Sequence, residues 1–223
     1  MNTLLLLLLD SRAPAGAHHH SGGMEAAVRA GLVTDLAGTE DFCRTRLRTS
    51  ARVAAGFAAA SCRLFSAERA GSPALADALA VLEAEFEART PSEATRTASR
   101  QLGRGLIRLL RSVLPEADPG LGPAPHHPLA LGAAVSLAGG DPELAARAAA
   151  LAACAGPASA AVRLLGLDPF AVHAMLARLA PGIDECAAFA AGCAQDCLPA
   201  DGAPALDLLP DYHLTAEVRL FAS

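Results

Sequence analysis

The stretch Ser92–Val113, SEATRTASRQLGRGLIRLLRSV, carries the most regular pattern in this chain of 223 residues. Its arginines recur at every third or fourth position and fall within about 120° of arc on a helix of about 3.6 residues per turn. These arginines are Arg96, Arg100, Arg104, Arg108 and Arg111. On the opposite side cluster Leu102, Leu106, Leu109 and Val113. The pattern predicts an amphipathic helix that begins at Ser92, with one arginine face and one face in the core.

The composition extends this helical interpretation to the whole chain. Hydrophobic residues make up 52% of the sequence but aromatic residues only 4%, with no Trp and one Tyr. Alanine and leucine dominate, which favours close-packed helices over a β-sandwich. A chain of this length can also bury a substantial core. We therefore predict an all-α fold in which residues 1–223 form a single domain of about ten helices arranged as antiparallel hairpins.

Turn residues and capping patterns divide the chain into predicted helices. These helices cover 4–9, 22–33, 39–67, 72–88, 92–113, 129–137, 142–154 and 206–221, with further helix starts at Pro157, Pro169 and Pro181. Prolines gather near 115–128 and 199–204, so we expect irregular, flexible loops there. His126 and His127 lie in the first of these loops and are expected to be a solvated pair.

Charge and hydropathy limit the classes of partner. The formal net charge is −5 and the pI is about 5.8, so the chain lacks the broad positive field that nucleic acid or anionic lipid requires. The run Leu4–Leu9 lacks a cationic n-region and is too short for a signal peptide, and no stretch reaches the ~18 apolar residues of a membrane span. We expect a cytoplasmic protein without nucleic-acid or membrane partners, whose six cysteines remain reduced.

Histidines and cysteines are the candidates for a metal or redox site. His18, His19 and His20 carry imidazoles that bind transition metals, but three consecutive residues cannot all face one ion in regular structure. His18 and His20 are therefore weak metal candidates. Cys193 and Cys197 are spaced to share one helix face, although cysteine more commonly serves as a small buried apolar residue. A metal-binding or thiol enzyme that uses these two clusters is the alternative function.

Sequence motifs for catalysis are not visible. The chain contains no GxxxxGK[ST] phosphate loop and no GxGxxG after a strand. No Ser-His-Asp or Cys-His catalytic arrangement is recognisable from the sequence. The arginine face could bind phosphate groups, but no aromatic residues interleave with it for base stacking, and Glu83, Glu85 and Glu87 precede it closely. We interpret it as an ion-pair face, within the chain or toward a protein partner, and keep a nucleic-acid-binding domain as a third option.

Three motifs in chain order resemble those of the urease accessory protein UreF family. The first is D-S-x-x-P-x-G-x-x-x-H-S-x-G-x-E, formed by Asp10, Ser11, Pro14, Gly16, His20, Ser21, Gly23 and Glu25. The second combines Ala98-Ser99-Arg100 with Gly103-Arg104 and Leu106, and the third combines His213 with Arg219-Leu220-Phe221-Ala222-Ser223. The segments His127–Gly132 and Gly156–Val172 extend the resemblance over nearly the whole chain, closest to the alanine-rich actinobacterial branch.

The resemblance implies a non-catalytic, all-α, dimer-forming scaffold. In that family the protein binds the accessory protein UreD, also called UreH, and the pair recruits the GTPase UreG. The assembly delivers nickel to apo-urease in a reaction coupled to GTP hydrolysis. We therefore expect no stably bound cofactor in this chain, with nickel and GTP with Mg acting through partner proteins, and a homodimer within the complex.

The resemblance also implies roles for particular residues. Partner-binding residues would be Glu25, Arg100, Arg104, Arg163, His213, Arg219, Leu220 and Phe221. The opening motif would be shaped by Asp10, Pro14, Gly16, Ser21 and Gly23. In relatives, the residue matching Arg219 is associated with GTPase recruitment and the one matching Glu25 with urease activation. The pair His18-His19 stands where many relatives carry other residues, so a histidine role in nickel passage is not carried over.

Overall fold

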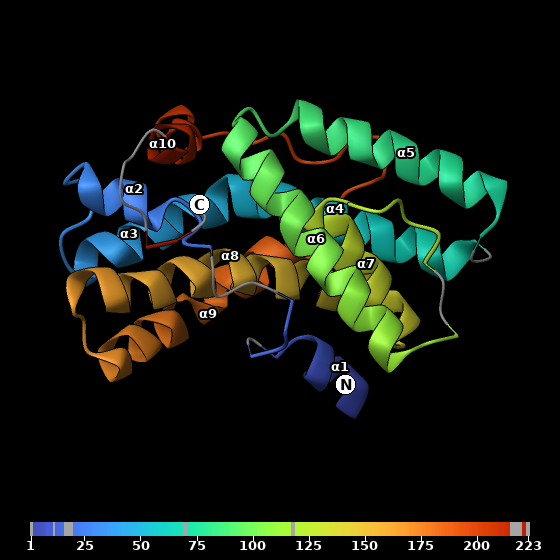
Figure 1. The fold of residues 1–223 in the computed structure, drawn as a ribbon, viewed down its shortest axis with the longest axis horizontal. Coiled ribbons are helices and arrows are strands. Elements are labelled where there is room, and N and C mark those ends of the chain that lie inside the picture. Colours follow the sequence, from blue (N-terminus) through green and yellow to red (C-terminus); the bar gives the residue numbers. More distant parts are fainter. Residues whose placement is uncertain are drawn as a thin grey trace.

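Helices make up all the regular structure in the part of the chain that the computed structural model describes, which is residues 2–10, 12–15, 20–68, 71–116, 119–214 and 220–221. For 212–214 only the backbone is described. The helices, labelled in Figure 1, are α1 Thr3–Leu8, α2 Met24–Arg29, α3 Leu36–Arg48, α4 Ser50–Ala67, α5 Pro73–Ala88, α6 Glu93–Val113, α7 His127–Leu137, α8 Pro142–Leu165, α9 Pro169–Gly192 and α10 Pro204–Leu214. The predicted all-α class is confirmed.

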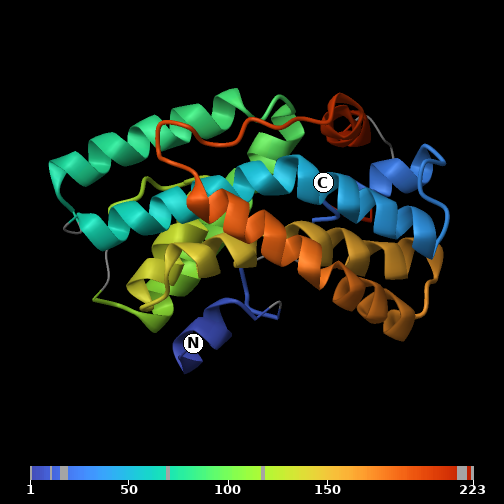
Figure 2. The same cartoon turned by 180° about the vertical axis from the view of Figure 1, so that it is seen from behind.

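Helix α4 lies at the centre of the fold. Almost every residue between Val53 and Phe65 is buried, and α4 packs against α7, α8 and α9. Figures 1 and 2 show α4 along the long axis of the molecule, with α6 crossing one face and α9 covering the other. Gly132 of α7 allows α7 to lie close against α4, because a Cβ there would lie 2.3 Å from the carbonyl oxygen of Ala58. The alanine-rich composition thus serves close helix contact.

Two long helices contain prolines at which the sequence predicts that new helices start. Helix α8 continues through Pro157 and α9 through Pro181, so the predicted starts there are wrong. Pro157 has no N–H to donate to the carbonyl of Ala153, four residues earlier. The Nε of Arg46 donates to that carbonyl instead, at 3.0 Å, which replaces the hydrogen bond that the proline cannot make. Helices α8 and α9 form one antiparallel hairpin.

The predicted helix 39–67 is two helices in the structure. Asp35 caps α3, whose first residue is Leu36, and the chain turns at Thr49 with φ −131° and ψ −107° before α4 begins. Neither glycine nor proline marks this turn, so no local signal predicts it. The turn separates the basic end of α3 from the apolar α4.

Helix α6 begins as predicted, with the Ser92 hydroxyl accepting from the N–H of Thr95 at 3.1 Å. Its buried face is rotated from the predicted one and consists of Ala94, Ser99, Gly103, Leu106, Ile107 and Leu110. Val113, predicted to be in the core, is exposed. Gly103 lies on the buried face, where a Cβ would be 2.0 Å from the carbonyl oxygen of Pro125. Backbone at Pro125 and His126 therefore packs directly against α6.

One of the described helices is long and apolar enough to cross a membrane by length and composition. It is α8, with a mean hydropathy of 1.5 over an 18-residue window. The core helix of a soluble protein passes the same test, and α8 packs against α3, α4 and α9 with Cys154 fully buried. Its hydropathy is accounted for by helix packing.

Candidate functional site

The opening motif forms a tight turn that leads into α2. Gly22 and Gly23 have φ values of +59° and +87°, which only glycine adopts without strain. The buried Ser21 hydroxyl accepts from the N–H of Glu25 at 3.3 Å, so serine and glutamate are fixed together. Helix α2 begins at Met24 and ends at Arg29, shorter than the predicted 22–33.

Glu25 contacts the last described residues of the chain rather than solvent. Its side chain is buried, with a relative exposure of 1%. Oε1 accepts from the backbone N–H of Leu220 and Oε2 from that of Phe221, both at 3.0 Å. The Nε of Arg29 lies 3.7 Å from Oε1. One buried carboxylate therefore accepts hydrogen bonds from two consecutive amides that lie about 195 residues away in the sequence.

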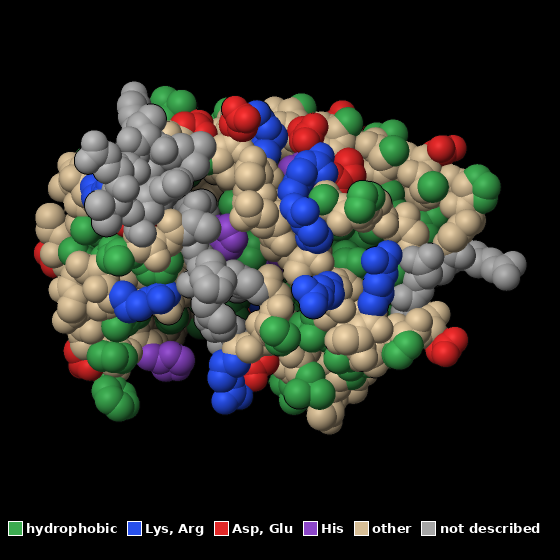
Figure 3. All heavy atoms as spheres, in the orientation of Figure 1, with side chains coloured by type: hydrophobic (Ala, Val, Ile, Leu, Met, Phe, Trp, Pro, Cys, Tyr) green, Lys and Arg blue, Asp and Glu red, His purple; other side chains and the backbone are tan. Residues whose placement is uncertain are grey.

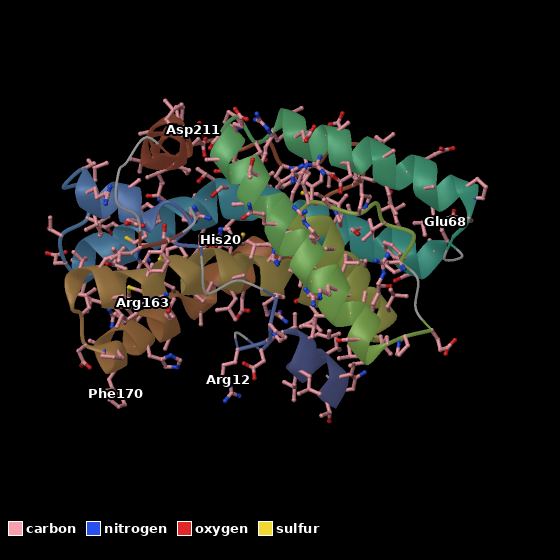
Figure 4. The ribbon with its side chains drawn as sticks, viewed as in Figure 1. Arg12, His20, Glu68, Arg163, Phe170 and Asp211 are labelled. Carbon is pink, nitrogen blue, oxygen red and sulfur yellow. The ribbon has the colours of Figure 1, made fainter. Side chains whose placement is uncertain are left out.

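The two side chains beside these amides lie in different environments. Phe221 is 5% exposed and belongs to a small apolar cluster with Met24, Phe42 and Leu209. The guanidinium of Arg163 stacks over its ring at 4.4 Å (Figure 4 labels Arg163 on α8). Leu220 is 71% exposed. We call Glu25, Arg163, Leu220 and Phe221 the tail anchor. It buries the side chain of Phe221 and leaves that of Leu220 exposed.

Helix α10 joins the tail anchor to the start of α6. Asp211, labelled in Figure 4, accepts through Oδ1 from the Ser92 hydroxyl at 2.9 Å and from the N–H of Ala94 at 3.0 Å. A carboxylate suits this position because the N–H groups of the first turn of a helix lack intrahelical partners. Pro210 lies against Gly23. Sequence reasoning missed Asp211, since nothing near residue 211 indicates a partner near residue 92.

Arg46 of α3 stabilises the opening turn through hydrogen bonds to backbone carbonyls. Its Nε donates to the carbonyl of Ala153, and its Nη1 donates to the carbonyl of Gly22 at 2.9 Å. Burial of the guanidinium lowers the pKa of Arg46. Gly22 in turn packs against Pro157. The proline of α8, the arginine of α3 and the glycine turn therefore depend on one another, and sequence reasoning did not single out Arg46.

The predicted arginine face divides into two parts. Arg100 donates to Glu83 at 3.2 Å, to Glu87 at 2.6 Å and to the carbonyl of Ala124 at 2.7 Å, so its role is within the chain. Arg104 is exposed and makes no hydrogen bond or ion pair with a described residue. Figure 3 shows arginine side chains along α6, with acidic side chains gathered toward α5. The ion-pair interpretation holds for Arg100, whereas Arg96 donates to the backbone carbonyls of Thr90 and Pro91.

Three further predicted residues that the structure describes, Asp10, Pro14 and His20, are not part of the tail anchor. Asp10 pairs with Arg12 at 2.8 Å, Pro14 is exposed and His20 is half-buried. Gly16, His18 and Arg219 lie outside the described residues, as does the side chain of His213. Their predicted roles therefore stay predictions.

His126 is buried and does not lie in solvent, so the expectation of a solvated pair is wrong. Its ring packs on Phe86 with centroids 4.7 Å apart, and its Nε2 lies 3.5 Å from a carboxylate oxygen of Glu87. Neither ring nitrogen has a hydrogen-bond partner among the described residues. Burial lowers the pKa of His126 to about 4, and the charge of Arg100 adds to this effect. The histidine is therefore neutral near pH 7.

The cysteines are free thiols, and Cys193 and Cys197 do not share a helix face. Helix α9 ends at Gly192, so Cys193 is its half-buried cap and Cys197 lies exposed in the following turn. Burial raises the pKa of Cys186 to about 11, which opposes thiolate chemistry there. Among the residues that the structure describes, no group of three or more His, Cys, Asp or Glu side chains is arranged to hold a metal ion.

These features define an all-helical scaffold whose distinctive site is a junction of its two chain ends. Comparison with known proteins gives the family: the UreF profile matches residues 33–180, and the chain belongs to the UreF family. The urease accessory protein UreF of Mycolicibacterium vanbaalenii is 45% identical over 220 residues, which is 98% of this chain and 97% of that protein. The UreF proteins of Mycobacterium sp. (strain JLS) and Mycobacterium tuberculosis are 46% identical over 223 residues and 41% over 221, and in each case about 98–99% of both chains is covered.

Proposed function

We propose that this chain is a non-catalytic urease accessory protein that acts in urease maturation. Family membership over nearly the whole chain is the observation that carries the proposal, because the matched relatives are named for that role. In its finer form, the chain binds UreD/UreH, and the pair recruits the GTPase UreG for GTP-dependent nickel delivery to apo-urease. A homodimer forms within that complex. Nickel is cargo, and GTP with Mg binds the GTPase.

The tail anchor suggests how such recruitment depends on the opening motif. Leu220 is exposed next to the buried Phe221, and Arg219, associated with GTPase recruitment in relatives, precedes it in sequence. Arginine and large apolar residues are typical of protein interfaces at their energetic centres. Glu25 is too buried to touch a partner. We assign it a positioning role, in which it fixes the backbone that presents the partner-binding residues.

The test is co-purification of the accessory assembly with variants of this chain. Arg219→Ala should leave the fold intact and weaken capture of the GTPase, and Glu25→Ala should do the same through loss of tail position. Arg108→Ala, an exposed arginine of α6, is the matched control and should capture normally. Capture of the GTPase at the wild-type level by Arg219→Ala would contradict the proposal.

Urease activation provides a second readout. In a nickel-limited activation assay we expect Glu25→Ala to reduce urease activity more than His19→Ala does, and equal defects would reverse that ranking. Metal analysis of the purified chain separates the accessory role from a metalloenzyme, since a stoichiometric ion that resists chelation would favour the enzyme.

A further inference from the structure

A groove lined with arginines lies between α9 and the junction of α3 with α4. It encloses about 310 Å³, and its walls carry Arg44, Arg48, Arg52 and Arg178. Figure 2 shows α9 in front of α4 on this side of the molecule. The local excess of positive charge stands out because the chain as a whole carries a net charge of −5.

Two of the four arginines are held in place by one carboxylate. Glu40 accepts from Arg44 at 2.5 Å and from Arg178 at 2.7 Å, which ties α3 to α9 across the groove. These hydrogen bonds lower the pKa of Glu40, so it stays charged. Among the described residues that line the groove, Glu185 carries the one carboxylate, against four guanidinium groups. Glu40 does not line the groove and reaches it only through its hydrogen bonds to Arg44 and Arg178.

The other two arginines, Arg48 and Arg52, have no anionic partner among the described residues. Arg48 makes no side-chain hydrogen bond or ion pair with any described residue, and neither does Arg52. The Nε of Arg52 is buried and unpartnered, while its guanidinium stacks over Phe189 at 4.6 Å. A buried donor without a partner costs free energy that an incoming acceptor would recover. These two arginines are the uncommitted donors of the groove.

The shape and spacing of the groove fit an extended peptide better than a compact anion. Arg44 and Arg48 are one helical turn apart, a rise of about 6 Å, close to the ~6.7 Å between alternate side chains of an extended strand. The floor contains the buried side chains of Leu47, Leu179 and Cys186, which suit apolar contact.

We infer that this groove binds an extended acidic segment of a partner protein, whose alternate carboxylates pair with Arg48, Arg52 and their neighbours. The inference goes beyond the proposed function and does not rest on it, because no residue of the tail anchor lines the groove. Peptide binding and GTPase capture can therefore fail independently.

The test uses the full chain and a short rhodamine-labelled peptide in which Glu and Thr alternate, with binding followed by fluorescence anisotropy at low salt. We expect saturable binding that the corresponding Gln-Thr peptide does not show. Arg48→Gln should weaken binding about tenfold. Arg108→Gln, which removes the same charge from the exposed surface of α6, should change it less than about twofold.

Glu185→Gln provides a measurement that damage to the fold would not mimic. It removes a carboxylate from the groove wall, so it should tighten binding of the acidic peptide. The inference is overturned if no saturable binding occurs, if Arg108→Gln weakens binding as much as Arg48→Gln, or if Glu185→Gln has no effect. Displacement of the peptide by an equal concentration of inorganic phosphate would overturn the assignment to a peptide.

Discussion

Replacement of Glu25 by Gln should release the C-terminal tail from the body of the protein. The carboxylate accepts one N–H on each oxygen, whereas a carboxamide has a single acceptor oxygen. The substitution therefore removes about one hydrogen bond to a charged acceptor, worth about 1.5–3 kcal/mol. That loss corresponds to a shift of roughly 10- to 150-fold toward the undocked tail.

Hydrogen exchange of the amides of Leu220 and Phe221 measures this shift directly. If the tail opens locally, both amides should exchange faster in Glu25→Gln by the same factor, and faster still in Glu25→Ala. Glu93→Gln is the matched control, because Glu93 is an exposed glutamate in the first turn of α6, as Glu25 is a buried one in α2. Amide exchange in Glu25→Gln that equals the wild-type rate would refute a positioning role for Glu25.

Gly103→Ala should lower the free energy of unfolding by about 1–3 kcal/mol in urea titration, because its Cβ would meet backbone at 2.0 Å, whereas Gly156→Ala in α8, with nothing within 4 Å, should be neutral or stabilising. Burial depresses the pKa of His126 from 6.5 to about 4, so the unfolded chain binds the proton more readily between these values. Stability is then fully present above about pH 6.5 and falls toward pH 4, by on the order of 2–3 kcal/mol, and urea unfolding of His126→Phe should show a smaller loss on acidification. Exposed Cys197 should react fastest with a thiol reagent at pH 8 and Cys186, with a pKa of about 11, far more slowly; Cys197→Ser should remove the fast phase, and its persistence would contradict the exposure difference.

Helices that begin with a capping side chain followed by proline or glutamate could be predicted from sequence to within about a residue. Ser72, Ser92, Asp141 and Asp168 each accept from the N–H groups of the turn that follows, as expected. Such signals are local. The turn at Thr49 carries none, and at Pro157 a distant residue overrides the local signal. Pro157 is predicted to start a helix. In the structure Arg46 donates to the carbonyl of Ala153, which the proline leaves without an N–H donor, and α8 continues.

The candidate site shows the same limit. The opening and closing motifs are both identified from the sequence, and the resemblance to the family implies that Glu25 binds a partner. Its contact with Leu220 and Phe221 spans about 195 residues of sequence, and no spacing rule connects such positions. Propensity and capping therefore predicted the elements, whereas the junction of the two chain ends required the packed structure.

That junction also has a consequence for the order in which the protein matures on the ribosome. The main apolar cluster uses residues from Leu5 to Leu198, whereas Phe221 belongs to a second, smaller cluster. Residues 220–221 are translated after all the residues that hold them, so Glu25 lacks its two amide partners until they have been added. A chain cut back to residues 1–219 would keep every described residue of the main cluster but would lose these two amides and the buried Phe221 side chain.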